Sequence, residues 1–327
     1  MPHGIHHTMN IKYKDLVLES IDLSDSTFVI SYGFSISKLR DSIEKIGVIN
    51  PPLVREEPGG KYRLVCGYKR LLVCRDIGVE RLRCAVVGRY IEDKDALLIN
   101  LYDNLSHRDL NPVEKSIAIG KLQEYYTDET IVKNFLPLLR LNPHYSIFNR
   151  VRSLSGLERE IKDAVVNGRL DEGAAIKLLG FSKNDRVLLF EVLSALRFSK
   201  NKQNEVIDNI YDITKRDECS VSDVLDSTEL KDILSNKDLN IPQRGGKMRR
   251  FLKKLRYPKI VKAEEGFMEI LRGLNLGDRI RLIPPPYFEG EKYNIEFQFG
   301  TIDELEENLE KIDSVKYDKG FRSLIED

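Results

Sequence analysis

The residues Leu64-Val65-Cys66-Gly67-Tyr68-Lys69-Arg70-Leu71 decide how the front of this chain is expected to fold. Apolar residues typical of a strand run into a glycine, and a segment with helical spacing follows at once. Glycine permits a tight turn and lets a ligand approach the backbone closely. The first amides of a helix attract anions, and Lys69 and Arg70 add positive charge there. The segment therefore predicts a phosphate-binding turn, although a surface turn with two solvated cations fits the same residues.

A second polar stretch, residues 102–112, reads Tyr-Asp-Asn-Leu-Ser-His-Arg-Asp-Leu-Asn-Pro. Asp103 and Asn104 offer the oxygen ligands that Mg²⁺ shares with substrate phosphates, and Asp103 is the candidate catalytic residue. The alternative is a helix end whose basic residues complement the helix dipole. In either case Asn111 and Pro112 predict the start of the next helix.

Composition restricts the classes of protein. A chain of 327 residues suits two or three domains. Its formal net charge is zero, so any contact with nucleic acid must come from local basic patches. The four cysteines form no Cys-x-x-Cys pair, which favours buried thiols in a reducing compartment. No apolar run is long enough to cross a bilayer, so a cytoplasmic protein with no membrane partner is expected.

The order of the expected elements predicts an α+β protein in three parts, after a disordered start at residues 1–10. Residues 11–110 mix short strands with helices, and residues 111–235 carry only helical patterns. Residues 236–327 begin with a linker and a basic helix and continue as a small α+β domain. In the front part, strands are expected at 52–55, 62–66 and 84–90, and helices at 37–46, 68–77 and 93–105.

Two segments are candidates for DNA contact. Residues 128–154 fit a helix-turn-helix whose second helix would present four polar side chains to base edges, namely Ser146, Asn149, Arg150 and Arg152. Residues 246–256 form a basic helix that could contact the DNA backbone, chiefly through Arg249, Arg250, Lys253 and Lys254. A packing helix with solvated arginines is the alternative for the first segment, and a solvated face or a surface for an acidic protein is the alternative for the second.

Taken together, four blocks in this order resemble the ParB family. The first runs from Leu39 to Arg55, and the second is Gly67-Tyr68-Lys69-Arg70, where the family has a Gly-Glu-Arg-Arg type of motif. The third joins residues 103–107 to 109–112, where the family has Glu-Asn-x-x-Arg followed by Asp-Leu-Asn-Pro. The fourth is residues 157–179. Ordered blocks are far more specific than any one short motif.

The resemblance implies a ParB/sulfiredoxin-like front domain, an all-α helix-turn-helix middle domain and a small α+β C-terminal domain. It implies that the front domain binds CTP with Mg²⁺ and that nucleotide closes a homodimer around DNA as a clamp in chromosome or plasmid partition. A partition ATPase is a further candidate partner. Asp103 and Asn104 would lie near the metal. The nucleotide-binding set implied by the resemblance is Arg55, Gly67, Tyr68, Lys69, Arg70, Asn104, His107 and Arg108.

Four positions depart from the family pattern. Tyr68 stands at its usual Glu, Leu72 at a frequent Arg, Asp103 at its Glu and His107 at its Arg. These departures leave open which nucleotide binds and whether it is hydrolysed. A weak CTPase, a transcription regulator or adaptor without turnover, and a nuclease or kinase on the same fold remain alternatives.

Overall fold

The computed structural model of the protein describes residues 9–290 and 292–326. The expectation of a disordered start at residues 1–10 falls on residues 1–8, which lie outside the described residues, and on residues 9 and 10. The chain divides into two compact units, Met1–Ile207 and Asp208–Asp327, and each is described by itself. The three-part division expected from the sequence stays a prediction.

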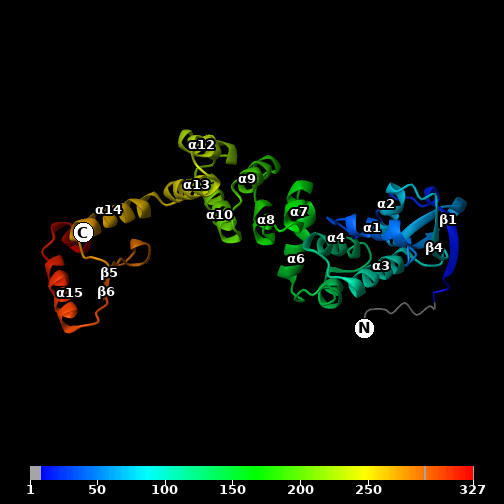
Figure 1. Ribbon diagram of the computed structural model, residues 1–327, viewed down its shortest axis with the longest axis horizontal. Helices are drawn as coiled ribbons and strands as arrows, with labels where there is room; N and C mark the ends of the chain where they lie inside the picture. Colours follow the sequence, from blue (N-terminus) through cyan, green and yellow to red (C-terminus); the bar gives the residue numbers. More distant parts are fainter. Residues whose placement is uncertain (1–8, 291, 327) are drawn as a thin grey trace. The chain divides into compact units, whose positions relative to one another are not determined.

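A mixed four-stranded sheet with the order β1-β4-β2-β3 forms the centre of the front domain (Figure 1). β4 (Arg81–Val87) lies antiparallel to β1 (Lys12–Val17) and parallel to β2 (Leu53–Glu56), and β2 lies antiparallel to β3 (Tyr62–Cys66). The expected strands are confirmed, with β4 beginning and ending earlier than expected. β1 was not predicted, because an edge strand with mainly exposed, charged side chains carries little hydrophobic signal.

Helices cover both faces of this sheet. α1 (Ser37–Ile46) and α2 (Tyr68–Asp76) pack on one face around buried residues such as Leu64 and Leu71. α3 (Asp93–His107) packs on the other face, where Val65 and Val87 join the core of the helices that follow. α2 therefore begins, and α3 ends, beside the same end of β3.

Residues 111–235 are all described and contain helices but no strand, as expected. α4 (Pro112–Leu122) opens with a capping box formed by Asn111 and Glu114. The other helices are α5 (Asp128–Thr130), η3 (Ile131–Phe135), α6 (Tyr145–Ser153), α7 (Arg159–Val166), α8 (Glu172–Leu178), α9 (Lys183–Leu196), α10 (Lys200–Arg216), α11 (Val221–Leu225) and α12 (Thr228–Ser235). α5 continues into η3, and a left-handed Arg140 precedes α6, which gives the helix, turn and helix that were expected between residues 128 and 154.

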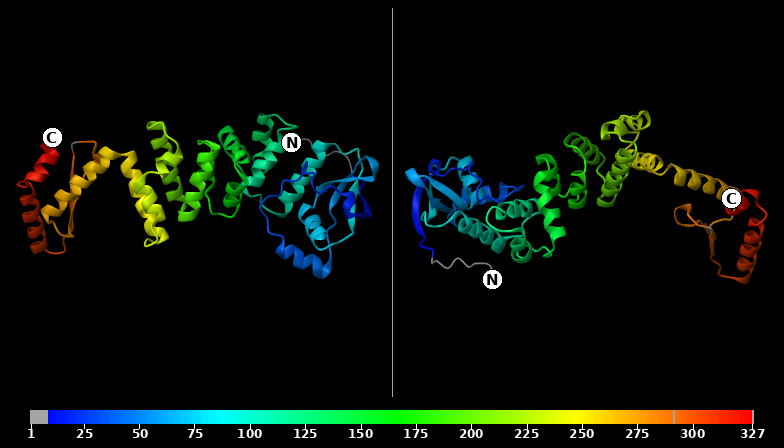
Figure 2. Two further views of the ribbon diagram at one scale, coloured as in Figure 1. Left: turned by 90° about the horizontal axis from the view of Figure 1, so that it is seen from above. Right: turned by 180° about the vertical axis from the view of Figure 1, so that it is seen from behind.

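The C-terminal segment contains α13 (Ile241–Arg256), α14 (Pro258–Leu274), β5 (Ile280–Ile283), β6 (Asn294–Phe297), α15 (Ile302–Val315) and α16 (Lys319–Glu326). α13 begins before the expected Gly246, because Asn240 and Gln243 form a capping box. β5 and β6 make an antiparallel pair beside α14 and the last helices, around a core that includes Phe267 and Leu282 (Figure 2). Within residues 9–290 and 292–326, no helix combines the length and the apolar composition needed to cross a bilayer.

Candidate functional site

The turn between β3 and α2 requires glycine. Gly67 has φ 99° and ψ 24°, a left-handed conformation that other residues rarely adopt. A Cβ atom at Gly67 would lie 3.0 Å from Pro52 Cβ and 3.0 Å from Arg70 Nη2. α2 starts at the next residue, so the turn brings the N-terminus of a helix to the end of the sheet. This is the strand, glycine and helix arrangement expected from the sequence.

A cavity of about 230 Å³ lies between this turn, α3 and the loop at residues 29–31. Most of the expected nucleotide-binding set lines it, namely Gly67, Tyr68, Lys69, Arg70, Asn104 and Arg108, together with Asp103. A second cavity of about 720 Å³ shares Arg70, Asp103, Asn104 and Arg108 with the first and adds His107. Two stretches separated by more than thirty residues in the sequence therefore meet at one site, and the second cavity has the size of ordinary small-molecule sites, roughly 300–1,000 Å³.

The cations of this site have no close partner in α2. The Lys69 Nζ lies 4.4 Å from the centroid of the Phe34 ring. Burial, followed by the positive charge of Arg108, lowers the pKa of Lys69, and the negative charge of Glu114 acts in the opposite direction. The guanidinium of Arg70 donates to the carbonyls of Asn50 and Pro51. A bound anion would relieve both the burial and the repulsion, so the arrangement favours a negatively charged ligand.

Three polar side chains follow one face of α3 at intervals of four residues. Asn100 Nδ2 donates to the Val65 carbonyl at 2.5 Å, and Asn104 Nδ2 donates to the Asn100 carbonyl at 2.9 Å. Arg108 Nη2 donates to Asn104 Oδ1 at 2.9 Å. Asn100 is only 5% exposed and lines the smaller cavity, yet the sequence reasoning missed it. Its signal was an amide inside the apolar run Ala96–Leu101.

Arg108 also pairs with a buried carboxylate that the sequence reasoning treated only as a capping residue. Its Nη1 lies 2.5 Å from Glu114 Oε2, and its Nη2 lies 2.9 Å from Glu114 Oε1. Glu114 is 1% exposed. A charge this deeply buried needs a partner, and Arg108 is the cation that supplies it while lining both cavities.

Asp103 is half-buried and offers the free carboxylate of the site. The Nδ1 of His107 lies 2.7 Å from the Asp103 carbonyl and 4.0 Å from its Oδ1. Burial, and then the negative charge of Asp103, raises the pKa of the neighbouring Cys66 thiol. Among residues 9–290 and 292–326, no three His, Cys, Asp or Glu side chains are grouped closely enough to hold a metal ion. The donors fit Mg²⁺ only as an ion coordinated mainly by ligand phosphates and water, with Asp103 as the protein carboxylate.

Arg55 is placed away from both cavities, unlike the rest of the expected set. It is 6% exposed, and its guanidinium donates to the Ile91 carbonyl at 2.8 Å. The same side chain pairs with Glu57 at 2.9 Å and with Asp93 at 2.7 Å. These partners satisfy the buried charge within the fold, so its position gives Arg55 a structural role rather than a place in the pocket lining.

The four residues expected to reach DNA from the helix-turn-helix are exposed on α6, namely Ser146, Asn149, Arg150 and Arg152. Phe148 and Val151 from the same helix are buried. α6 therefore packs by its apolar side and leaves a polar side open, which is the arrangement that a recognition helix needs. Arg150 lies 3.7 Å from Glu172, and Arg152 lies over the Phe148 ring.

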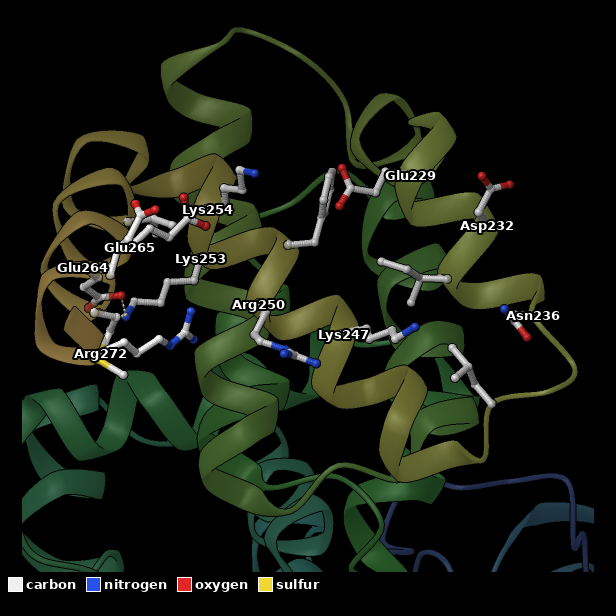
Figure 3. Close-up of a pocket in the computed structure, with 16 residues that line it drawn as sticks. Glu229, Asp232, Asn236, Lys247, Arg250, Lys253, Lys254, Glu264, Glu265 and Arg272 are labelled. Atoms are coloured by element: carbon white, nitrogen blue, oxygen red, sulfur yellow. Dashed lines mark hydrogen bonds and ion pairs between the residues drawn. The ribbon is translucent and has the colours of Figure 1, made fainter. Parts of the chain in front are cut away.

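The basic helix α13 is surrounded differently. It lines a cavity of about 1,110 Å³ together with α12 and α14 (Figure 3). The cations in the lining are Lys247, Arg250, Lys253, Lys254 and Arg272, and the carboxylates are Glu229, Asp232, Glu264, Glu265 and Glu269. Lys253 Nζ contacts Glu264 at 2.7 Å. Arg249, the remaining residue of the expected DNA-contacting set on α13, is outside this lining. Contact with DNA by α13 stays a prediction.

Comparison with known proteins bears on the front domain. The sequence profile of the ParB N-terminal domain matches residues 32–105. The probable chromosome-partitioning protein ParB of Vibrio cholerae is 24% identical over 204 residues, which cover 62% of this chain and 67% of that protein. The corresponding protein of Neisseria meningitidis is 30% identical over 147 residues, which cover 44% of this chain and 49% of that protein. The chain thus spans about half the length of the latter relative.

Among solved structures, the chain is similar to the C-terminally truncated chromosome-partitioning protein ParB from Caulobacter crescentus complexed with CTP-gamma-S. The identity is 22% and the TM-score 0.27, with 56% of this chain and 98% of that chain covered. The profile match lies on the sheet and on the two helices that carry the cavity, between residues 32 and 105. With the relatives named above, it shows that this chain belongs to the ParB family.

Proposed function

We propose that the protein is a CTP-regulated DNA-binding protein that acts as a clamp in chromosome or plasmid partition. The observation that carries this proposal is the convergence of Lys69, Arg70 and Arg108 on one cavity at the glycine turn, with Asp103 opposite. Cations with a helix N-terminus suit a polyphosphate, and a carboxylate beside them suits the Mg²⁺ that accompanies it.

The two adjoining cavities divide the ligand chemically. The smaller one is lined by the glycine turn and the cations, so it would take phosphates. The larger one adds apolar side chains, including Ile49 and Leu53, so it would take the base and sugar. CTP is the nucleotide that the ParB resemblance implies. When bound, Mg²⁺ would neutralise phosphate charge, and Asp103 would hold it from the protein side.

DNA would be contacted first by the exposed face of α6. Nucleotide and DNA act together if CTP binds one conformation of a homodimer better than another, because a ligand shifts a population only through its differential affinity. A partition ATPase is the further partner proposed for this system. Hydrolysis would be slow, with Asp103 orienting water, because His107 occupies the place of the Arg that the family motif carries.

Calorimetry tests the nucleotide part of the proposal. Titration of the full chain with each of the four NTPs, with and without Mg²⁺, should give saturable heat with CTP. Arg70→Ala should weaken CTP binding roughly 10- to 100-fold, because a hydrogen bond to a charged group contributes about 1.5–3 kcal/mol. Arg75→Ala is the matched control, since Arg75 lies in the last turn of α2 and lines neither cavity. Absence of binding by every NTP would end the proposal.

Phosphate release tests the catalytic assignment. Wild type incubated with CTP and Mg²⁺ should release phosphate slowly, and the release should rise when duplex DNA is added. Asp103→Asn should abolish it while CTP binding persists within about tenfold, since the amide keeps the shape of the carboxyl group but loses its charge. An Asp103→Asn variant with unchanged turnover would remove Asp103 from the catalytic role.

A further inference from the structure

A continuous series of hydrogen bonds connects the candidate nucleotide site to the start of α4. It begins where Asn100 donates to the last turn of β3 and passes along α3 through Asn104 to Arg108. Arg108 then reaches Glu114, at the third position of α4, through both of its terminal nitrogens. The cavity and the first turn of α4 are therefore connected through one guanidinium.

Glu114 organises the structure around α4. Its Oε2 accepts from the backbone amide of Asn111 at 3.0 Å and completes the capping box. Its Oε1 accepts from the backbone amide of Tyr32 at 3.0 Å. Arg108 is the cation among these donors. If Arg108 left, a carboxylate that is 1% exposed would keep only two amides, which favours rearrangement of the cap.

We infer that Arg108 is a positioning residue that transmits occupancy of the cavity by nucleotide phosphates to α4, by exchanging the Glu114 carboxylate for a phosphate. This inference rests on the proposed function. Arg108 already lines both cavities, and it faces Lys69 with no anion between them. A polyphosphate carries more negative charge than one carboxylate, so it competes for the same guanidinium. Departure of Arg108 also releases Asn104 Oδ1, which could then face the ligand.

The loop that forms the other wall of the cavity would carry the same change further. Ser31 accepts from Arg108 at 3.4 Å, and the next residue, Tyr32, is bound to Glu114 by its amide. The Tyr32 carbonyl accepts from the Asn111 side chain at 3.0 Å, and its hydroxyl donates to the Arg159 carbonyl, in the first turn of α7, at 3.3 Å. Movement of Glu114 would therefore be felt at α7 as well as at α4.

The decisive variant is Glu114→Gln. Glutamine is accepted at the third position of a capping box, so the start of α4 can still form. The variant removes the competitor for Arg108 and should bind CTP with Mg²⁺ on the order of 5- to 10-fold more tightly, within the usual range of coupling between two sites. Asp171→Asn is the matched control, because Asp171 is a half-buried capping carboxylate of α8 that pairs with Lys200 at 2.8 Å and lines neither cavity. Its CTP affinity should equal that of wild type.

Hydrogen exchange of the full chain supplies the structural readout. In wild type, CTP should change the protection of residues 111–122, and in Glu114→Gln these amides should already differ without nucleotide and respond little to it. Arg108→Gln should weaken CTP binding on the order of tenfold, so the two variants shift affinity in opposite directions, which a purely structural role would not produce.

Glu114→Gln with wild-type affinity and a wild-type exchange response, in a folded protein, would overturn the inference. If wild type binds no nucleotide, the proposed function fails first, and this result is distinguishable because no variant needs to be compared. Wild type that binds CTP without any change at residues 111–122 leaves the proposed function intact and refutes the coupling.

Discussion

The cavity at the β3–α2 turn and the groove along α13 both gather basic side chains, yet their surroundings differ. In the groove, cations and carboxylates are equal in number, and Lys253 already pairs with Glu264. At the turn, Lys69 faces an aromatic ring and a second cation, and its pKa is lowered by burial. A cation that lacks a charged partner attracts a ligand, whereas a neutralised cation contributes little. The neighbours in space, rather than the density of charge along the sequence, separate the two regions.

The comparison has an energetic basis. Exposed ion pairs such as the one between Lys253 and Glu264 contribute roughly 0–1 kcal/mol, and salt screens them further. A groove with balanced charge also exerts little long-range attraction on DNA. The front cavity keeps Lys69 partly buried beside Arg108, and an entering phosphate would interact with both through a region of reduced dielectric constant. Nucleotide binding should therefore respond strongly to substitutions, and DNA binding through α13 should respond weakly.

The largest effect is expected from the glycine at the turn. Gly67→Ala forces a Cβ into a left-handed conformation, where it would approach Pro52 and Arg70 to 3.0 Å. We expect the variant to lose CTP affinity by about 100-fold or more, because the turn and Arg70 shift together, and to lose about 1–2 kcal/mol of stability. Calorimetry with CTP and thermal denaturation measure the two effects.

The control for this substitution is Gly78→Ala. Gly78 also has a left-handed φ, of 77°, but nothing lies within 4 Å of an added Cβ, and the residue lines neither front cavity. It should therefore reproduce the backbone strain and the loss of stability while CTP binding stays at the wild-type level. Equal losses of affinity in both variants would show that strain alone, and not the cavity, explains the effect.

Local patterns predicted the elements that carry the front site. The strand at 62–66, the turn at Gly67 and the helix that starts at Tyr68 follow from composition over a few residues, and they agree with the structure. The convergence of Lys69 with Asp103 came from the ordered motifs and not from local pattern. The capping residues Asn111 and Glu114 were also recognised as a helix start.

What the sequence missed depends on long-range packing. Glu114 fits a capping pattern, but its pairing with Arg108 becomes visible only in three dimensions. Asn100 occupies an apolar face of α3, and only the fold shows that its amide reaches the carbonyl of Val65. Arg55 was expected in the pocket, and the structure instead surrounds it with carboxylates and a carbonyl. The basic run of α13 was visible in the sequence, but the acidic residues that face it come from α12 and α14.

An intermediate effect is expected in DNA binding, and it compares α6 with α13 directly. The logarithm of affinity for a duplex of mixed sequence should be measured against the logarithm of salt concentration. The slope falls by about 0.9 for each phosphate contact that is lost. The double variant Arg150→Ala and Arg152→Ala should lower the slope by roughly 1–2 and weaken binding at least tenfold, because these side chains lie on the exposed face of α6.

The matching double variant on α13 is Arg250→Ala and Lys254→Ala, since both residues are exposed and both line the charge-balanced groove. We expect its slope to stay within about half a unit of wild type. A larger decrease for the α13 pair than for the α6 pair would restore α13 as the main DNA-contacting helix and would contradict the contrast between the two basic regions.

The smallest effect concerns pH and isolates the unpaired state of Lys69. The pKa of Lys69 is lowered from its ordinary value by burial and by Arg108, so free protein loses this charge at a lower pH than an exposed lysine does. Without ligand, the unfolded chain binds more protons over the interval just below the ordinary value, and the stability from this group rises with pH there. With phosphate bound, the charged form is favoured, so binding takes up a proton above the lowered pKa.

CTP affinity should therefore fall as pH rises above that pKa, by at most tenfold per pH unit, and calorimetry between about pH 8 and 9.5 in two buffers of different ionisation enthalpy should detect the proton uptake. Lys69→Gln should bind more weakly and lose this pH dependence. Lys121→Gln is the control: burial also lowers the pKa of Lys121, but its ammonium donates to the carbonyls of Ser26 and Thr27 and lines neither front cavity. If Lys121→Gln removes the dependence and Lys69→Gln keeps it, the charge that the ligand meets is not Lys69. The contrast between an unpaired cation at the turn and paired cations on α13 would then lose its electrostatic basis.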